Sequence, residues 1–144
     1  MEQGGDCDVV VMGGGNAALC AALSARDAGA RVMLFERAPE DQRSGNSCFA
    51  GGNGRVVYDG VAEIKKLVRD LTAGSRSRSA ASRSTPPAEA VDVMDQALPG
   101  LFAAGEVVGG IFYFDYPGGS GLSRGPVLGK IAGASAAQYA KAAV

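Results

Sequence analysis

The segment from Asp8 to Arg37, DVVVMGGGNAALCAALSARDAGARVMLFER, constrains the fold of this chain more than any other part of it. Its pattern predicts an apolar strand, a glycine turn, an alanine-rich helix that begins near Asn16, and a second apolar strand that ends in an acid. Two strands joined by a helix in this way form the βαβ unit of an α/β fold with a parallel sheet.

The spacing of small residues in the turn predicts an adenine dinucleotide site. Gly13 permits the tight turn, Gly15 lets a pyrophosphate approach the backbone, and Ala18 lets helix and strand pack closely. The helix N-terminus directs unpaired N–H groups and the positive end of its dipole at the phosphates. Glu36 follows by about 20 residues and can accept hydrogen bonds from a ribose 2′-hydroxyl. The alternative is an ordinary βαβ unit whose glycines only make a turn.

Composition narrows the classes of protein that remain. The 144 residues suit one domain, and the net charge of −1 offers no electrostatic footprint for nucleic acid. No apolar run is long enough to span a bilayer. The three cysteines form no C-x-x-C pair, which predicts neither a disulfide nor a metal site and favours a reducing cytoplasm. The sequence contains no histidine, which excludes a Ser–His–Asp triad and histidine metal ligands.

The chain divides into three pieces. Residues 1–73 hold the βαβ unit, a polar loop, a short apolar run (Arg55 to Tyr58) and an amphipathic helix predicted from Val61 to Leu71. Residues 74–90, GSRSRSAASRSTPPAEA, have no large apolar side chain and predict a flexible linker. Their arginines could also form a nucleic-acid tail, but no aromatic residue interleaves them. Residues 91–144 form the third piece.

The third piece predicts a second helix that faces the same crevice. A turn at Leu98-Pro99-Gly100 and a strand at 101–104 lead into a glycine-rich loop, followed by a small-residue helix from about Ser123 to Ala143. Glu106 follows the strand and therefore lies at the carboxyl edge of the sheet, where such folds bind ligands. Two helix N-termini at one crevice suit a long ligand with a pyrophosphate at one end and a reducible ring at the other. Alternatively, the glycines serve a surface hairpin.

Three segments together resemble a known flavoprotein family that includes fumarate reductases, succinate dehydrogenase flavoprotein subunits and 3-ketosteroid dehydrogenases. They are VVVMGGGNAALCAALSARDAGARVMLFERAP, RSGNSCFAGGNGRVVYDGV and DQALPGLFAAGEVVGGIFYFDYPGGSGLSRGPVLGKIAG, about two-thirds of the chain, and the nearest likeness is to the tricarballylate-dehydrogenase-like branch. The resemblance implies FAD as the cofactor and a Rossmann-like FAD/NAD(P)-binding fold, a parallel sheet flanked by helices.

The resemblance also implies which residues contact the cofactor. They belong to short motifs at the carboxyl edge of the sheet. They are Gly13, Gly14, Gly15, Asn16 and Ala17 at the pyrophosphate, Glu36 and Arg37 at the adenosine ribose, Gly45, Asn46 and Ser47 along the FAD near the flavin, Gly105 and Glu106 at the ribityl chain, and Gly119, Ser120, Gly121 and Leu122 at the flavin ring.

The sequence departs from the family in its middle. Members of the family are much longer and carry a further strand, an A-T-G-G turn and a substrate-capping domain where this chain has residues 74–90. Most residues that bind carboxylates and deliver protons come from that part. Tyr116 is the remaining candidate for a substrate contact and catalytic residue, although Tyr113 and Tyr116 could simply cover the flavin crevice. The internal deletion could be natural, engineered or a reading-frame artefact.

Two functions follow as expectations. The first is the FAD-binding domain of a flavin-dependent oxidoreductase that transfers hydride at a carbon–carbon bond next to a carboxylate or carbonyl. The second is a non-catalytic FAD-binding remnant or carrier, because the capping domain is missing. An NAD-binding protein explains the A-A-G-E and G-G-S-G segments less well. A parallel sheet that lacks a strand exposes an edge, which predicts either a core stabilised by FAD or a homodimer through that edge. The substrate and the redox partner cannot be read from the chain.

Overall fold

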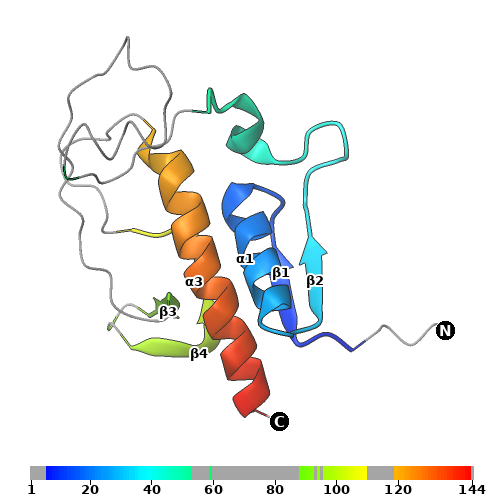
Figure 1. Ribbon diagram of the computed structural model, residues 1–144, viewed down its shortest axis with the longest axis vertical. Coiled ribbons are helices and arrows are strands. Elements are labelled where there is room, and N and C mark those ends of the chain that lie inside the picture. Colours follow the sequence, from blue (N-terminus) through cyan, green and yellow to red (C-terminus); the bar gives the residue numbers. More distant parts are fainter. Residues whose placement is uncertain are drawn as a thin grey trace.

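The computed structural model describes residues 6–52, 59, 88–92, 94, 96–109 and 119–143. Its elements are β1 (Val9–Met12), α1 (Asn16–Asp27), β2 (Val32–Phe35), a 3-10 helix (Gly45–Phe49), β3 (Glu89–Val91), β4 (Ala97–Phe102) and α3 (Ser120–Ala142). Figure 1 shows α1 covering one face of β1 and β2, with α3 beside α1. The expected strand at 55–58, helix at 61–71 and Tyr116, together with residues 74–87 of the expected linker, lie outside the described residues.

The predicted strand–helix–strand unit is confirmed. β1 and β2 pair in parallel, with Val9 opposite Val32 and Met12 opposite Phe35. Side chains alternate across the sheet, so Val9 and Val11 are buried beneath α1 while Val10 and Met12 are exposed. The core that Val9 and Val11 enter consists mostly of alanines of α1, α3 and the turn before β2. Because these side chains are small, the layers of this fold lie close together.

A row of glycines brings α3 against α1. Gly125, Gly129 and Gly133 recur every four residues and therefore share one face of α3. A Cβ at Gly129 would press against the carbonyl oxygen of Ala17, and one at Gly133 would lie 2.8 Å from the carbonyl carbon of Ala21. Only glycine permits this close approach of the two backbones. The expected small-residue helix is thus present, beginning at Ser120 rather than near Ser123.

Polar groups tie α3 to α1 along the same interface. The Ser24 hydroxyl donates to the carbonyl of Lys130 over 2.8 Å, and Lys141 Nζ donates to the carbonyl of Ala28 over 2.6 Å. The Ala28 carbonyl lies just beyond the end of α1, where backbone acceptors lack helical partners. The C-terminal turn of α3 therefore completes the hydrogen bonding at the end of α1.

The third piece differs from the expectation around Pro99. The predicted turn at 98–100 is wrong, because one strand, β4, runs from Ala97 to Phe102 through Pro99 and Gly100. The strand predicted at 101–104 is therefore confirmed only for its first two residues. It pairs antiparallel with β3, and the register shifts between Glu89 and Val91. Gly100 has φ +78°, so the chain bulges there and the pairing resumes beyond it. β3 begins at Glu89, so the end of the expected linker is part of a strand.

The described strands form two separate pairs, β1–β2 and β3–β4, rather than the larger parallel sheet that the resemblance implies. β4 attaches to α3 through Tyr139, whose ring meets Phe102 edge-on at a centroid distance of 6.2 Å. A Cβ at Gly100 would lie 3.0 Å from the ring of Tyr139. Within the part of the chain that the structure describes, no helix is long and apolar enough to cross a membrane.

Asp8 and Arg31 join the start of β1 to the start of β2. The Asp8 carboxylate accepts hydrogen bonds from the Arg31 backbone N–H at 2.7 Å and from its guanidinium at 2.8 and 3.2 Å. These bonds lower the pKa of Asp8 from 3.8 to about 2. The folded state therefore favours the ionised carboxylate. The resulting stability is fully present above the ordinary pKa and is lost as the pH falls through the folded value.

We expect an Asp8→Asn variant to be less stable than the parent protein at neutral pH, with a difference that shrinks as the pH is lowered from about 4 to about 2. Urea unfolding followed by circular dichroism across this pH range measures the difference. Asp27→Asn is the matched control, because Asp27 is exposed and meets Arg26 only at 4.0 Å. A difference between parent and Asp8→Asn that stays constant down to pH 2 would contradict the assignment.

Candidate functional site

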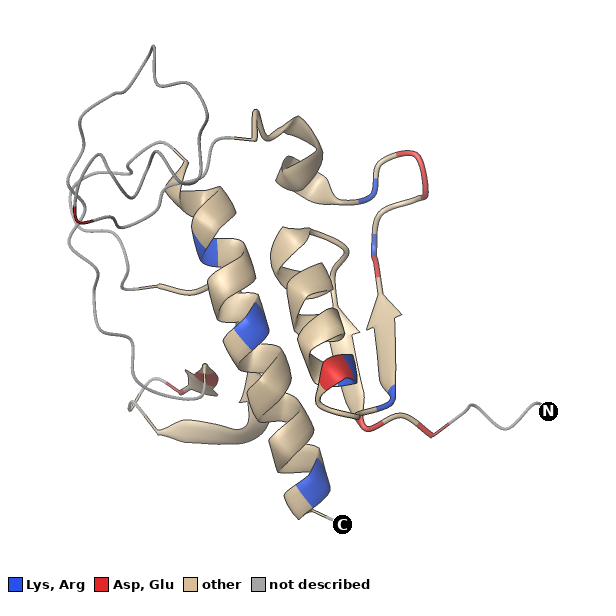
Figure 2. Ribbon diagram, in the orientation of Figure 1, with Lys and Arg blue, Asp and Glu red and all other residues tan. Residues whose placement is uncertain are grey.

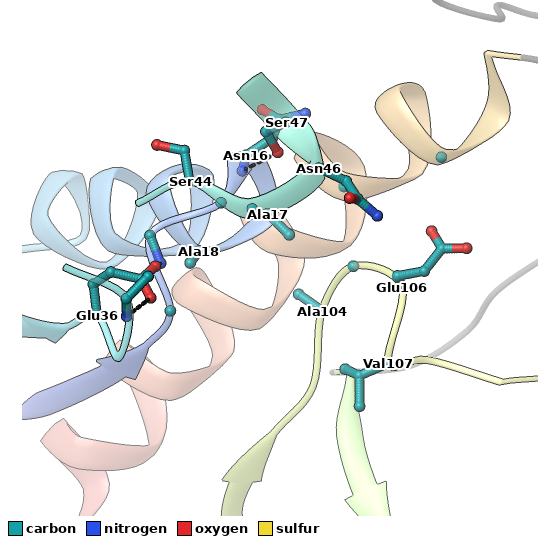
Figure 3. A pocket seen from close by; sticks show the side chains of 18 of the residues that line it. Asn16, Ala17, Ala18, Glu36, Ser44, Asn46, Ser47, Ala104, Glu106 and Val107 are labelled. Atoms are coloured by element: carbon teal, nitrogen blue, oxygen red, sulfur yellow. Dashed lines mark hydrogen bonds between the residues drawn. The ribbon is translucent and has the colours of Figure 1, made fainter. Parts of the chain in front are cut away.

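A cleft of about 910 Å³ opens at the carboxyl end of β1. Its walls come from the glycine turn, the loop after β2, the 3-10 helix, the loop after β4 and the N-terminal turns of α3, as Figure 3 shows. The lining residues are Met12, Gly13, Gly14, Gly15, Asn16, Ala17, Ala18, Glu36, Arg37, Ala38, Gln42, Ser44, Gly45, Asn46, Ser47, Ala50, Ala104, Gly105, Glu106, Val107, Gly121, Leu122 and Gly125. Segments more than 100 residues apart in the sequence therefore share one concave site.

The glycine turn is held by Glu36. Gly13 has φ +111°, which lets the chain leave β1 sharply, and its N–H still donates to the Phe35 carbonyl at 2.7 Å. The Glu36 carboxylate then accepts the N–H of Ala38 at 2.8 Å and that of Gly14 at 2.6 Å. Both bonds lower the pKa of Glu36, Ala38 contributing more. An ionised acid therefore stands at the end of β2 beside the turn.

The 3-10 helix lies over the N-terminus of α1. The backbone N–H of Asn16, the first residue of α1, donates to Ser47 Oγ at 3.0 Å. Ser44, which precedes the 3-10 helix, adopts a left-handed conformation with φ 78°. A Cβ at Gly15 would lie 3.5 Å from Ser47 Oγ, which is van der Waals contact and shows how near the 3-10 helix comes to the glycine turn. The G-N-S loop thus shapes the cleft above the helix start.

Pro126 explains how the two helix N-termini are joined. A proline has no N–H, so Pro126 cannot donate to the carbonyl of Leu122 four residues earlier in α3. The side chain of Asn16 supplies the missing donor, because its Nδ2 donates to the Leu122 carbonyl at 3.2 Å. Asn16 Oδ1 in turn accepts a long contact of 3.8 Å from Cys20 Sγ. One side chain therefore connects the first turn of α1 to the first turn of α3.

The loop after β4 packs between the two helices. Gly105 has φ +86°, and a Cβ there would lie 2.8 Å from the Cβ of Ala17. The Gly105 carbonyl accepts the Val108 N–H at 3.1 Å and Arg124 Nη2 at 2.9 Å. Glu106 follows with a side chain that is 68% exposed, 3.5 Å from Arg124. Its carboxylate lies at the mouth of the cleft (Figure 3).

The cleft brings together most of the residues singled out from the sequence. Those that line it are Gly13, Gly14, Gly15, Asn16, Ala17, Glu36, Arg37, Gly45, Asn46, Ser47, Gly105, Glu106, Gly121 and Leu122. Gly119 and Ser120 stand at the start of α3 outside the lining, and Tyr116 lies outside the described residues. The individual roles of these residues toward a cofactor stay predictions.

Sequence reasoning missed several residues of the site. The additional lining residues include Ala38, Gln42, Ser44, Val107 and Gly125. The four-residue spacing of glycines in the last helix could have marked Gly125 as a close-contact position, since such a stripe is typical of tight helix packing. No local signal marks Gln42 or Ser44. Across the described ranges, no group of three or more histidine, cysteine or acidic residues is placed to hold a metal ion.

Comparisons with known proteins assign the family. The model of the FAD binding domain family matches residues 8–92, which is more than half of the chain. The chain therefore belongs to the FAD binding domain family, and FAD is the cofactor that the family match indicates. The match runs from β1 through β3 and includes the residues between the 3-10 helix and β3.

Two relatives from Shewanella frigidimarina match a shorter stretch. A probable fumarate reductase, Ifc3, of strain NCIMB 400 is 42% identical over 53 residues, which are 37% of this chain and 9% of the relative. A fumarate reductase (cytochrome) is 41% identical over 54 residues, which are 38% of this chain and 10% of the relative. The matched region thus spans about a tenth of these relatives. No solved structure matches this chain.

Proposed function

We propose that this chain is the FAD-binding domain of a flavin-dependent oxidoreductase and that the cleft at the end of β1 holds the cofactor. The observation that carries the proposal is the convergence of three elements on one cleft: the N-terminus of α1, the N-terminal turns of α3 and the Gly105–Glu106 loop. A helix N-terminus favours a negatively charged or electron-rich group. A cleft of this size also suits a ligand as large as a dinucleotide.

The residues present fit FAD along its length. In the proposed arrangement the turn from Gly13 to Ala17 receives the pyrophosphate, because its backbone can be approached closely and α1 points at it. Glu36 and Arg37 receive the adenosine ribose, since the Glu36 carboxylate is ionised and fixed. The rest of the cofactor, from the ribityl chain to the flavin ring, lies in this arrangement along three further segments. They are the loop around Asn46, the Gly105–Glu106 loop and the first turn of α3 with Leu122.

When bound, FAD supplies a ring that accepts or donates a hydride. The chain's own residues bind and orient it. By likeness to the fumarate reductases above, we propose a substrate whose reacting carbon–carbon bond adjoins a carboxylate or carbonyl. Tyr116 stays the candidate substrate contact. That the substrate-capping part is missing around residues 74–90 stays a prediction from the resemblance, whatever the origin of the deletion.

A second candidate function is a flavin carrier without turnover. The absence of histidine from the sequence favours it, since histidine is the commonest general acid or base in enzymes. The predicted homodimer through a sheet edge is supported by the pairing of the described strands, among which β1 pairs with β2 alone. The cytoplasmic location likewise stays a prediction.

Binding of FAD tests the proposal directly. We expect the purified protein to take up FAD, to quench its fluorescence, and to gain on the order of 3–4 kcal/mol of stability at a few hundred times the dissociation constant. Thermal melting with and without FAD measures the gain, with NAD as the control ligand. A colourless protein with an unchanged melting temperature would contradict the proposal. Turnover with a dye acceptor and fumarate or aconitate separates the enzyme from the carrier.

A further inference from the structure

Arg124 is a charged side chain that α3 buries in its second turn. Its side chain is only 7% exposed, although burying a guanidinium is unfavourable unless polar groups compensate it. Figure 2 shows that the charges on α3 are few and all positive; the sequence identifies them as Arg124, Lys130 and Lys141. Arg124 is neither in the lining of the cleft nor among the residues that the sequence pattern singled out.

The contacts of Arg124 lead to the loop after β4. One nitrogen, Nη2, donates to the Gly105 carbonyl at 2.9 Å and lies 3.5 Å from Glu106 Oε2. A single guanidinium group therefore contacts both the backbone and the side chain of consecutive residues. Arginine suits a buried ion pair because its guanidinium is always charged and is more weakly hydrated than the ammonium group of lysine.

The same loop is held on its other side by α1. Gly105 approaches Ala17 so closely that a Cβ would lie 2.8 Å from the Ala17 side chain. Arg124 contacts the loop from α3. Within the described residues the ion pair engages Oε2 of Glu106, so Oε1 can still accept a hydrogen bond from a ligand. The loop is thus clamped between two helices and presents an acceptor at the mouth of the cleft.

We propose that Arg124 is a positioning residue of the cofactor site: it joins α3 to the Gly105–Glu106 loop and thereby holds the Glu106 carboxylate where a hydroxyl-bearing part of the cofactor passes. The inference rests on the proposed function of the cleft and extends it. Arg124, which is buried and outside the lining of the cleft, would hold the Gly105–Glu106 wall of the cleft in place before the cofactor binds. Such pre-organisation raises affinity because less ordering remains for the binding step.

An Arg124→Gln variant of the full chain tests the proposal, with two readouts. The first is hydrogen exchange of the Val108 amide in the cofactor-free protein, because that amide donates to the Gly105 carbonyl and reports the loop. The second is the dissociation constant for FAD. We expect exchange at Val108 to quicken and FAD binding to weaken by about tenfold, the effect of losing one charge-assisted hydrogen bond, while the amides of β1 keep their protection.

Two further variants sharpen the comparison. Arg124→Lys keeps the charge and should recover part of the loop protection and of the affinity. Lys130→Gln removes one positive charge from an exposed position on the same helix and should change neither readout. Unchanged exchange at Val108 together with unchanged FAD affinity in Arg124→Gln would overturn the proposal. So would an equal loss of protection at Val108 and in β1, which would make Arg124 a residue of the fold alone.

The role of Arg124 and the proposed function of the cleft are tested by different measurements. A parent protein that binds no FAD would refute the cofactor site. The exchange of Val108 in the cofactor-free protein would still decide whether Arg124 holds the loop.

Discussion

Replacing Gly133 with alanine should destabilise the protein, even though alanine is the better helix former. In an exposed helix the change would raise stability by about 0.5–1 kcal/mol. Here the new Cβ would lie 2.8 Å from the carbonyl carbon of Ala21 and 2.9 Å from its Cα, atoms of the α1 backbone that cannot rotate away. The helices must separate, which we expect to lower the free energy of unfolding by about 2–3 kcal/mol.

This loss is a substantial share of the stability of a small domain, about 5–15 kcal/mol. Urea unfolding followed by circular dichroism measures it. Gly109→Ala is the control, because a Cβ at Gly109 would meet no atom of the described residues within 4 Å. The sign of the effect decides the outcome. If Gly133→Ala unfolds at a higher urea concentration than the parent protein, helix propensity outweighs the contact and the close packing of α1 and α3 is disproved.

The largest effect on cofactor binding should come from Glu36. Its carboxylate accepts the N–H groups of Gly14 and Ala38 and so fixes the turn, while the ionised acid is the proposed partner of the adenosine ribose. Glu36→Ala removes the anchor of the turn and the acceptor for the ribose together. We expect FAD binding to weaken by about a hundredfold, as the loss of two charge-assisted hydrogen bonds would produce.

Fluorescence titration with FAD measures this change in affinity. Two further variants serve as comparisons. Glu36→Gln keeps a neutral acceptor and should lie between the parent protein and Glu36→Ala. Glu40→Ala removes an acid four residues away, whose side chain is 87% exposed and whose contact with Arg43 spans 3.6 Å, and it should bind FAD as the parent does. Equal affinities of Glu36→Ala and Glu40→Ala would rule out the ribose assignment.

Prediction from sequence succeeded where local pattern and final structure agree. The apolar run of β1, the alanine-rich run of α1 and the glycine turn between them belong to one βαβ unit, whose parts are neighbours in sequence. The expectation around Pro99 failed for the opposite reason. Proline and glycine together usually mark a turn, but pairing with β3 and the contact of Gly100 with Tyr139 keep this stretch in a bulged strand. Of these two partners, β3 lies only a few residues before β4, whereas Tyr139 belongs to the last helix and is distant in sequence.

The candidate site shows the same division. The order of strand, glycine turn, helix and acid follows from the residues alone, because all of them belong to one βαβ unit of consecutive elements. The contact between the α1 part and the α3 part of the site cannot be predicted from the residues alone. Pro126 leaves a carbonyl without its helical donor, and only the packed structure reveals that Asn16, far away in the chain, supplies the bond. Likewise, only tertiary packing buries Arg124 against the Gly105–Glu106 loop. Every residue has a backbone carbonyl, so the sequence does not indicate that Arg124 binds the carbonyl of Gly105.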